Sequence, residues 1–354
     1  MGLNNNWTFH RKFWKGRKVL ITGHTGFKGS WLVVLLNYLK ADIYGLSLEN
    51  QESVNLFESA NLHSLCNNYF LDIVDKKKVE KAIKEIQPEF VIHMAAEALV
   101  RRSYREPLRT FNTNVIGTAN ILEVLREIKG FRSGVFITTD KVYDNENQNV
   151  SFKENSSLGG HDPYSASKAA SEMIIDSYRK SFFLEKRVPI SSARAGNVIG
   201  GGDWSEDRLI PDLIRSIYAK EKLVIRNPKS TRPWQHVLDP LFGYLTLAEK
   251  QYENYDLNGS YNFGPSLNQS LSVEEIVSLT GTNEFITTES LMQPYEAQAL
   301  SLDTAKAKRK LYFENKWSVQ DSILATLNWY KDFYDNHNPV ELCLKDINNY
   351  INPK

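Results

Sequence analysis

The chain has 354 residues, of which 42% are hydrophobic and 24% are charged. This length predicts two domains, or one large domain with an insertion, and it allows a large core without disulfides or structural metal. Lys and Arg total 43 and Asp and Glu total 42, so the net charge of +1 excludes the broad basic surface of a general nucleic-acid binder. Two cysteines, Cys66 and Cys343, exclude a disulfide scaffold, and no apolar run is long enough to span a membrane. We therefore predict a cytoplasmic protein with neither a nucleic-acid nor a membrane partner.

Strand and helix patterns alternate through the first half of the chain. Short apolar runs predict strands at residues 17–22, 42–48, 69–72, 90–94, 134–138 and 188–193. Helical length and spacing predict helices at residues 26–40, 76–86, 107–128 and 163–184. This order predicts an α/β fold, a Rossmann-like doubly wound parallel sheet with helices on both faces.

The pattern loosens after about residue 195, where prolines separate short segments. We predict a sheet domain over residues 1–194, with a returning segment near residues 236–262. Residues 195–354 then form mainly a smaller α/β substrate-binding domain. One late helix is clear, because Ser318 and Asp321 form a capping-box pattern at its start.

A glycine turn follows the first predicted strand, in the segment from Gly23 to Gly29 (Gly-His-Thr-Gly-Phe-Lys-Gly). Glycines at this point let the backbone approach a pyrophosphate, and the N–H groups of the following helix face that anion. The spacing is G-x-x-G-x-x-G, which a simple tight turn would also give. Its place after the first strand of an alternating pattern favours dinucleotide binding. No Arg follows the second strand to bind a 2′-phosphate, which favours NAD.

Two sites carry candidate acid–base groups. Tyr164 and Lys168 lie four residues apart, so they share one face of a helix, and a neighbouring ammonium lowers the pKa of a phenol. The alternative is an ordinary surface pair. Thr139, Asp140 and Lys141 follow the fifth strand, where the carboxyl ends of parallel strands face the ligand crevice. An ionisable pair there suits an elimination, which needs one group to take a C–H proton and another to protonate a leaving hydroxyl. The alternative is a solvated turn.

These segments resemble the extended short-chain dehydrogenase/reductase family over nearly the whole chain. Matching segments include residues 93–96 beside the cofactor phosphates and residues 114–118 on the next helix, where Asn114 would tie backbone segments together. Within that family, five segments in the same order are similar to the CDP-glucose 4,6-dehydratases. They are residues 23–31, 139–144, 158–164, 196–204 and 232–240.

The resemblance implies a lyase that converts CDP-glucose to CDP-4-dehydro-6-deoxyglucose by internal hydride transfer through bound NAD. Tyr164, helped by Lys168, would remove the proton of the sugar 4-hydroxyl, Thr139 would bond near O4, and Asp140 would protonate the 6-hydroxyl. Lys141 is either the C5 base or a group that places the sugar. The implied cofactor-binding residues are Gly23, Thr25, Gly26, Phe27, Lys28, Gly29, Asp72, Ile73, Ala95, Ala96, Tyr164 and Lys168. The implied substrate-binding residues are Ser103, Asn197, Arg208, Leu209, Arg232 and His236.

Three alternatives stay open at this point. They are a 4,6-dehydratase acting on UDP-N-acetylglucosamine, a nucleotide-sugar 4-epimerase, and a non-enzymatic regulator on the same fold. The seven histidines show no metal-ligand spacing, so we predict no metal. The resemblance further implies a homodimer or homotetramer, and a deoxysugar product for a cell-surface polysaccharide such as O-antigen.

Overall fold

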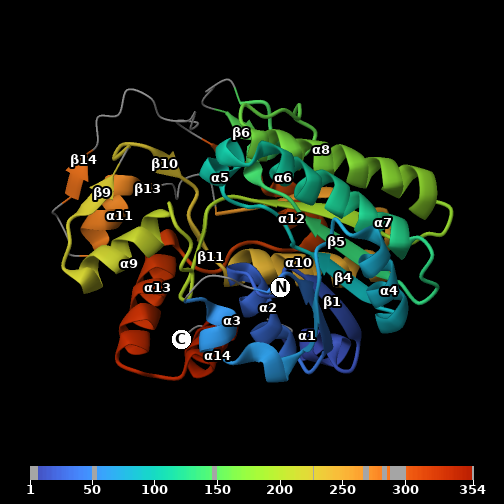
Figure 1. Ribbon diagram of the computed structural model, residues 1–354, viewed down its shortest axis with the longest axis horizontal. Helices are drawn as coiled ribbons and strands as arrows, with labels where there is room; N and C mark the ends of the chain where they lie inside the picture. The colour runs from blue at the N-terminus through green and yellow to red at the C-terminus, as the bar shows by residue number, and fades with distance from the viewer. Residues whose placement is uncertain are drawn as a thin grey trace.

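A seven-stranded parallel sheet forms the centre of the protein, with strand order β12-β7-β5-β4-β1-β2-β3 (Figure 1). The computed structural model describes residues 7–49, 54–145, 150–225, 227–265, 271–280, 285–287 and 300–352. Each pairing between neighbouring strands is parallel. The strands are β1 (Lys18–Thr22), β2 (Asp42–Ser47), β3 (Asn67–Phe70), β4 (Phe90–His93), β5 (Ser133–Ile137), β7 (Ile190–Ala195) and β12 (Ser260–Phe263).

Successive strand residues enter two different cores, one on each face of the sheet. Val19 and Ile21 belong to the core shared with α2 (Phe27–Tyr38) and α10 (Leu238–Glu253). Leu20, between them, belongs to the core shared with three helices on the other face, which are α4 (Lys76–Ile86), α7 (Thr118–Leu125) and α8 (Pro163–Tyr178). Because both faces are covered, the strands are continuous apolar runs rather than alternating ones. The predicted doubly wound fold is confirmed.

Several predicted boundaries differ from the structure. The third strand is Asn67–Phe70 rather than 69–72, because its pairing with β2 begins at Asn67 and Leu71 makes the last backbone bond before a turn. The sixth is Ile190–Ala195 rather than 188–193. The predicted helix 107–128 is three segments, α6 (Pro107–Phe111), a π-helical stretch (Asn112–Gly117) and α7, and it ends at Leu125.

The C-terminal half adds a lobe beside the sheet (Figure 1). The lobe contains α9 (Leu209–Ala219), α11 (Val273–Leu279), the pair β9 (Leu223–Ile225) and β14 (Phe285–Thr287), and the pair β10 (Thr231–Arg232) and β13 (Leu271–Ser272). Further elements of the described residues are α1 (Trp7–Trp14), α3 (Leu56–Ser59), α5 (Val100–Arg105), β6 (Ser151–Phe152), β8 (Val198–Ile199), β11 (Gln235–His236), β15 (Ser301–Leu302) and α12 (Ala305–Leu311), with four more short 3-10 or π-helical segments at Leu62–Leu65, Asp140–Val142, Arg179–Phe183 and Tyr255–Leu257.

Parts of the C-terminal half also lie against the sheet domain. Helix α10 packs on β5, and β12 pairs with β7, so this stretch of chain returns to the sheet. Helix α13 (Val319–Tyr334) begins with the predicted capping box of Ser318 and Asp321. Helix α14 (Pro339–Ile351) packs on α2. The domain boundary near residue 194 stays a prediction.

A buried carboxyl joins α10 to α14 and makes stability depend on pH. Asp239 Oδ1 accepts bonds from the Tyr350 hydroxyl (2.6 Å) and the Lys316 backbone N–H (2.9 Å). Burial raises the pKa of Asp239 to about 7. In the unfolded chain such a carboxyl ionises at pH ~3.9. The stability that the neutral carboxyl contributes is therefore fully present below that pH. It is lost as the pH rises through about 7, the pKa of Asp239 in the folded protein.

The amide of Asp239→Asn is neutral at every pH. We therefore expect the melting temperature to fall less in Asp239→Asn than in the wild type between about pH 5 and about pH 8. Thermal unfolding followed by fluorescence measures this. The exposed carboxylate Asp335 provides the control, as Asp335→Asn. Equal losses in the wild type and Asp239→Asn would contradict the expectation.

Within the described residues, no helix combines the length and the apolar character that crossing a membrane requires.

Candidate active site

The glycine turn lies where the strand order reverses, between the carboxyl ends of β1 and β4. Gly23 has φ +75°, and a Cβ there would lie 2.8 Å from the Ala95 backbone nitrogen. A Cβ on Gly29 would collide with the Gly23 carbonyl oxygen. Gly26 is the N-cap of α2 and gives that helix no side-chain cap. The glycines therefore bring two loops and an uncapped helix N-terminus together at the switch point, where open α/β sheets bind ligands.

The end of β4 is held in place by a buried histidine. The His93 ring nitrogens pair with the hydroxyls of Thr22 (2.7 Å) and Thr118 (3.0 Å). Burial, followed by the charge of Lys168, lowers the pKa of His93 to about 3, so the ring is neutral. Asn114 bonds both the N–H and the C=O of Glu97, and it donates to Ser167 Oγ (2.8 Å). These bonds tie the end of β4 to α7, and the loop after β4 to the π-helical stretch and α8.

The acid–base turn follows β5 as a single 3-10 turn (Asp140–Val142). Thr139 caps this turn, and its hydroxyl donates to Asp140 Oδ1 at 2.9 Å. Asp140 is 4% exposed, and burial raises the pKa of its carboxyl, against the opposing effects of Lys141, Thr139 and Arg232. A raised pKa extends to higher pH the range in which a carboxyl can donate a proton.

Helix α8 carries Tyr164 and Lys168. Asp162 caps the helix by accepting from the Ser165 N–H (2.9 Å), which fixes Tyr164 in its first turn. Lys168 Nζ donates to the Ile137 carbonyl at 3.0 Å, so the ammonium lies at the end of β5. Tyr164 hydrogen-bonds to the Thr139 side chain. The structure thus brings the phenol and the acid–base turn together.

The predicted lowering of the Tyr164 pKa is not found. Burial raises the pKa of Tyr164 to about 12, and the main opposing effect is the hydrogen bond with Thr139 rather than the charge of Lys168. The pKa of Lys168 is itself lowered to about 7, first by burial and then by the charge of Lys28. Burial, followed by the charge of Arg208, lowers the pKa of Lys28 to about 8. Packing several cations together in one buried site disfavours each charge, so the site suits an anionic ligand.

A cavity of about 320 Å³ opens between the sheet and the lobe. It brings together most of the catalytic predictions and most of the substrate predictions. The predicted site residues that line it are Phe27, Lys28, Thr139, Asp140, Lys141, Tyr164, Asn197, Arg208, Leu209 and Arg232.

Other predicted site residues lie apart from this cavity. His236 is fully buried between the rings of Trp31 and Trp317, and burial lowers its pKa to about 3. Ser103 accepts from the Tyr164 backbone N–H (3.2 Å), so it supports α8. Asp72 accepts from the Val74 N–H within the turn after β3. The rest are Gly23, Thr25, Gly26, Gly29, Ile73, Ala95, Ala96 and Lys168, which belong to the switch point, its neighbouring turns and the base of α8.

The cavity wall also contains residues that the sequence analysis did not select. Asp203 accepts from Arg208 Nη1 at 3.0 Å, and Arg101 pairs with Asp207 at 3.3 Å across the two sides of the cavity. The segment Gly200–Asp203 was part of a matched motif, and that motif was the available signal for Asp203. Trp234 lines the cavity, whereas Trp204 packs in an aromatic cluster of α13.

Fold and site together define an α/β enzyme with acid–base side chains at the carboxyl edge of a doubly wound sheet. A family model described as GDP-mannose 4,6 dehydratase matches residues 20–326. The CDP-glucose 4,6-dehydratase of Salmonella typhimurium is 39% identical over 351 residues, covering 96% of this chain and 98% of that relative. The chain therefore belongs to the family that this model describes, and the predicted resemblance is confirmed.

Solved structures support the same fold. UDP-glucose 4-epimerase from Thermotoga maritima, with UDP-glucose, has a TM-score of 0.78 and 23% identity, covering 89% of this chain and 99% of that chain. The dTDP-glucose 4,6-dehydratase of Bacillus anthracis, in complex with NAD, has a TM-score of 0.74 and 24% identity, covering 92% and 100%. At these identities the likeness establishes the architecture.

Proposed function

We propose that this chain is a hydro-lyase that removes water from CDP-glucose, with NAD bound at the glycine turn. The observation that carries the proposal is one cavity whose wall contains Tyr164, Thr139 and Asp140 together with Arg208 and Arg232, with Thr139 hydrogen-bonded to Asp140. Tyr164 can accept the hydroxyl proton of the oxidation, and Asp140 can donate a proton to the leaving hydroxyl of the elimination that follows. The name of the Salmonella relative agrees with this reaction.

The residues at the switch point fit a dinucleotide. Gly23, Gly26 and the α2 N-terminus form a cradle for a pyrophosphate, and Lys168 lies beside the end of β5. NAD, when bound, supplies a reversible oxidation of the sugar and returns to its starting state, so no net reductant is consumed. We assign Thr25, Phe27, Lys28, Gly29, Asp72, Ile73, Ala95 and Ala96 to the same site.

The chain's own groups then move protons. Tyr164 takes the proton of the sugar 4-hydroxyl, and its hydrogen bond with Thr139, the main effect that opposes the raised pKa of the phenol, stabilises the phenolate. Thr139, bonded to both Tyr164 and Asp140, holds the oxygen at C4. Asp140 protonates the 6-hydroxyl, so that water leaves after the C5 proton has been removed. Arg208 and Arg232 bind the diphosphate, which their planar guanidinium groups match.

Mass spectrometry of CDP-glucose incubated with purified protein and NAD tests this function. UDP-, dTDP- and GDP-glucose are run in parallel. We expect loss of one water from CDP-glucose, with no net accumulation of reduced cofactor. Loss of water from another nucleotide sugar instead would keep the chemistry and overturn the base assignment. No loss from any of them would overturn the function.

Lys141 supplies a separate prediction. It lines the cavity next to Asp140, where it can take the C5 proton or orient the sugar. We expect Lys141→Met to oxidise C4 but to lose dehydration by about 10²-fold or more. Trapping with borodeuteride measures this, because reduction adds one deuterium to every 4-ketone and the undehydrated sugar is then recognised by the mass of its retained 6-hydroxyl oxygen. Exposed Lys153 gives the control variant Lys153→Met. Full dehydration by Lys141→Met would remove this lysine from the mechanism.

We further propose a homodimer through α6, the π-helical stretch and α8. Leu108, Ile116 and Met173 are 78%, 47% and 60% exposed on these elements, and a second copy packed there would cover these large apolar side chains. Light scattering after gel filtration gives the mass that tests this assembly. A cytoplasmic location and a place in O-antigen synthesis stay predictions.

A further inference from the structure

A fully buried ion pair lies beside the candidate active site and takes no part in the proton transfers above. Arg194 on β7 donates to Glu172 on α8 through both Nε (3.0 Å) and Nη2 (2.7 Å). The two side chains are only 3% and 2% exposed. Taking two charges out of water is costly, so a buried pair is weak evidence for a stabilising role. Its position therefore calls for another explanation.

Both carboxylate oxygens of Glu172 accept further hydrogen bonds. Oε1 accepts from the Thr138 hydroxyl (2.6 Å), and Oε2 accepts from the Ser192 hydroxyl (2.7 Å). Burial would raise the pKa of Glu172, but the hydrogen bonds and charge of Arg194, with Thr138 and Ser192, hold that pKa below its ordinary value. The carboxylate is ionised and is held in one orientation.

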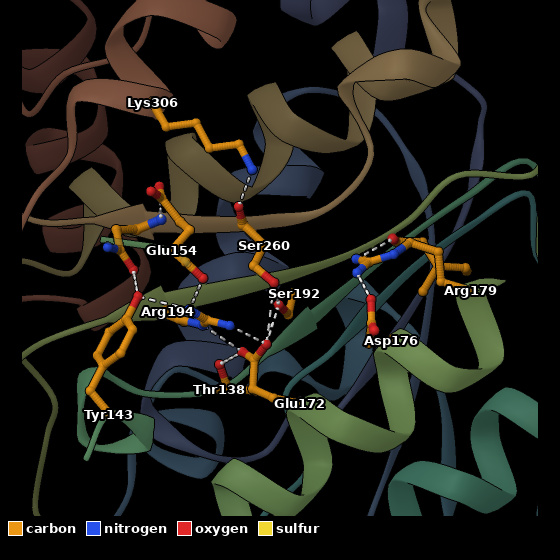
Figure 2. A network of polar contacts seen from close by, with 12 residues as sticks. Thr138, Tyr143, Glu154, Glu172, Asp176, Arg179, Ser192, Arg194, Ser260 and Lys306 are labelled. Carbon is orange, nitrogen blue, oxygen red and sulfur yellow. Dashed lines mark hydrogen bonds and ion pairs between the residues drawn. The ribbon is translucent and has the colours of Figure 1, made fainter. Parts of the chain in front are cut away.

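The pair contacts both ends of the acid–base turn. Thr138 comes directly before Thr139, and Tyr143 comes directly after the turn Asp140–Val142. Arg194 Nη1 donates to the Tyr143 hydroxyl at 2.8 Å, and that hydroxyl donates to Asn262 Oδ1 at 2.6 Å. Figure 2 shows Arg194 between Glu172 and Tyr143, with Thr138 beside the carboxylate.

The other end of the pair lies on the helix of the phenol. Glu172 is eight residues after Tyr164 and four after Lys168, about 12 Å and about 6 Å along α8. Residues at this spacing face the same side of a helix. The same group of side chains therefore contacts both the acid–base turn and the helix that carries the phenol.

We propose that Glu172, Arg194 and Tyr143 form a positioning unit. This unit holds Thr139 and the acid–base turn in a fixed position relative to Tyr164 and Lys168. The inference deepens the proposed function and rests on it for the identity of the reaction. Tyr143 is the member that acts on the turn alone, since Glu172 also holds α8. Its loss affects the elimination groups Asp140 and Lys141 more than the oxidation groups on α8.

Tyr143→Phe tests this with little change in packing. The ring is 1% exposed and stacks on Phe152 (5.0 Å between centroids, 8° between planes), so phenylalanine keeps the ring and loses only the hydroxyl. Asn262 keeps its bonds to the Phe152 and Asp303 carbonyls. The matched control is Tyr261→Phe, an equally buried tyrosine on β12 whose hydroxyl donates to the Leu257 carbonyl.

We expect Tyr143→Phe to slow water loss by about 10- to 100-fold with KM nearly unchanged, and to accumulate oxidised, undehydrated sugar in the borodeuteride trap. Hydrogen–deuterium exchange supplies a second readout. Peptides covering residues 139–145 should exchange faster in Tyr143→Phe than in Tyr261→Phe. If Tyr143→Phe does not fold, Thr138→Val removes the hydrogen bond from Thr138 to Glu172 instead. We expect the same slower water loss and faster exchange in that variant.

Two outcomes overturn the proposal. One is unchanged exchange in residues 139–145, and the other is an equal loss of oxidation and elimination. If the wild type dehydrates no nucleotide sugar, the proposed function fails, and the exchange measurement still decides the positioning.

Discussion

Tyr164→Phe should reduce turnover of CDP-glucose by about 10³-fold, with substrate affinity nearly unchanged. The phenol is buried at the cavity wall and bonded to Thr139, so removing its oxygen removes the group that accepts the 4-hydroxyl proton. The ring stays in place because Asp162 and Ser103 hold the first turn of α8 through backbone bonds. No oxidised sugar should appear in the borodeuteride trap, because the first step is blocked.

A second tyrosine on the same helix gives the control. Tyr178 is bonded to Glu123 Oε2 at 3.2 Å and lies outside the cavity. Tyr178→Phe should turn over normally. Steady-state kinetics and calorimetric titration of substrate separate turnover from affinity. Retention of more than about a tenth of the wild-type rate by Tyr164→Phe would show that another group accepts this proton.

Asp140→Asn should block a later step. We expect C4 oxidation to continue while water loss falls by about 10²-fold or more, because the amide is no longer able to give its proton to the leaving hydroxyl. Oxidised, undehydrated sugar should therefore accumulate, unlike in Tyr164→Phe. Asp144 is a half-exposed carboxylate four residues along the chain, and Asp144→Asn is the control. Equal loss of both steps in Asp140→Asn would contradict the assignment.

The same carboxyl gives a pH dependence with a definite sign. Burial raises the pKa of Asp140, so its acid form persists to higher pH than that of an exposed aspartate. As pH rises through this raised pKa the acid is lost and water loss slows, while oxidised sugar accumulates. Asp140→Asn should lack this change. Rapid-quench analysis across a pH series measures the ratio of the two species.

Much of the fold could be predicted because its signals are local. Buried parallel strands are continuous apolar runs, and the glycines between β1 and α2 are required by contacts only a few residues away or just across the switch point. Asp140 and Tyr164 were found for a related reason. The carboxyl ends of parallel strands and the start of the following helix meet at one edge, so their chemistry is placed by the strand order.

The remainder depended on contacts between segments far apart in the chain. The sequence by itself determined the alternating elements, the glycine turn, and the acid–base residues of the cavity. Only the tertiary structure decided that His236 is enclosed by Trp31 and Trp317, and that Glu172 and Arg194 pair beneath the acid–base turn. A histidine in a motif or a glutamate in a helix has the same local pattern whether it faces a ligand or a core. The burial of His236 depends on Trp31, which lies more than a hundred residues away in the chain. The charge of Glu172 is paired by Arg194, which lies on a neighbouring strand. The raised pKa of Tyr164 has the same origin, since the surrounding fold removes water from the phenol.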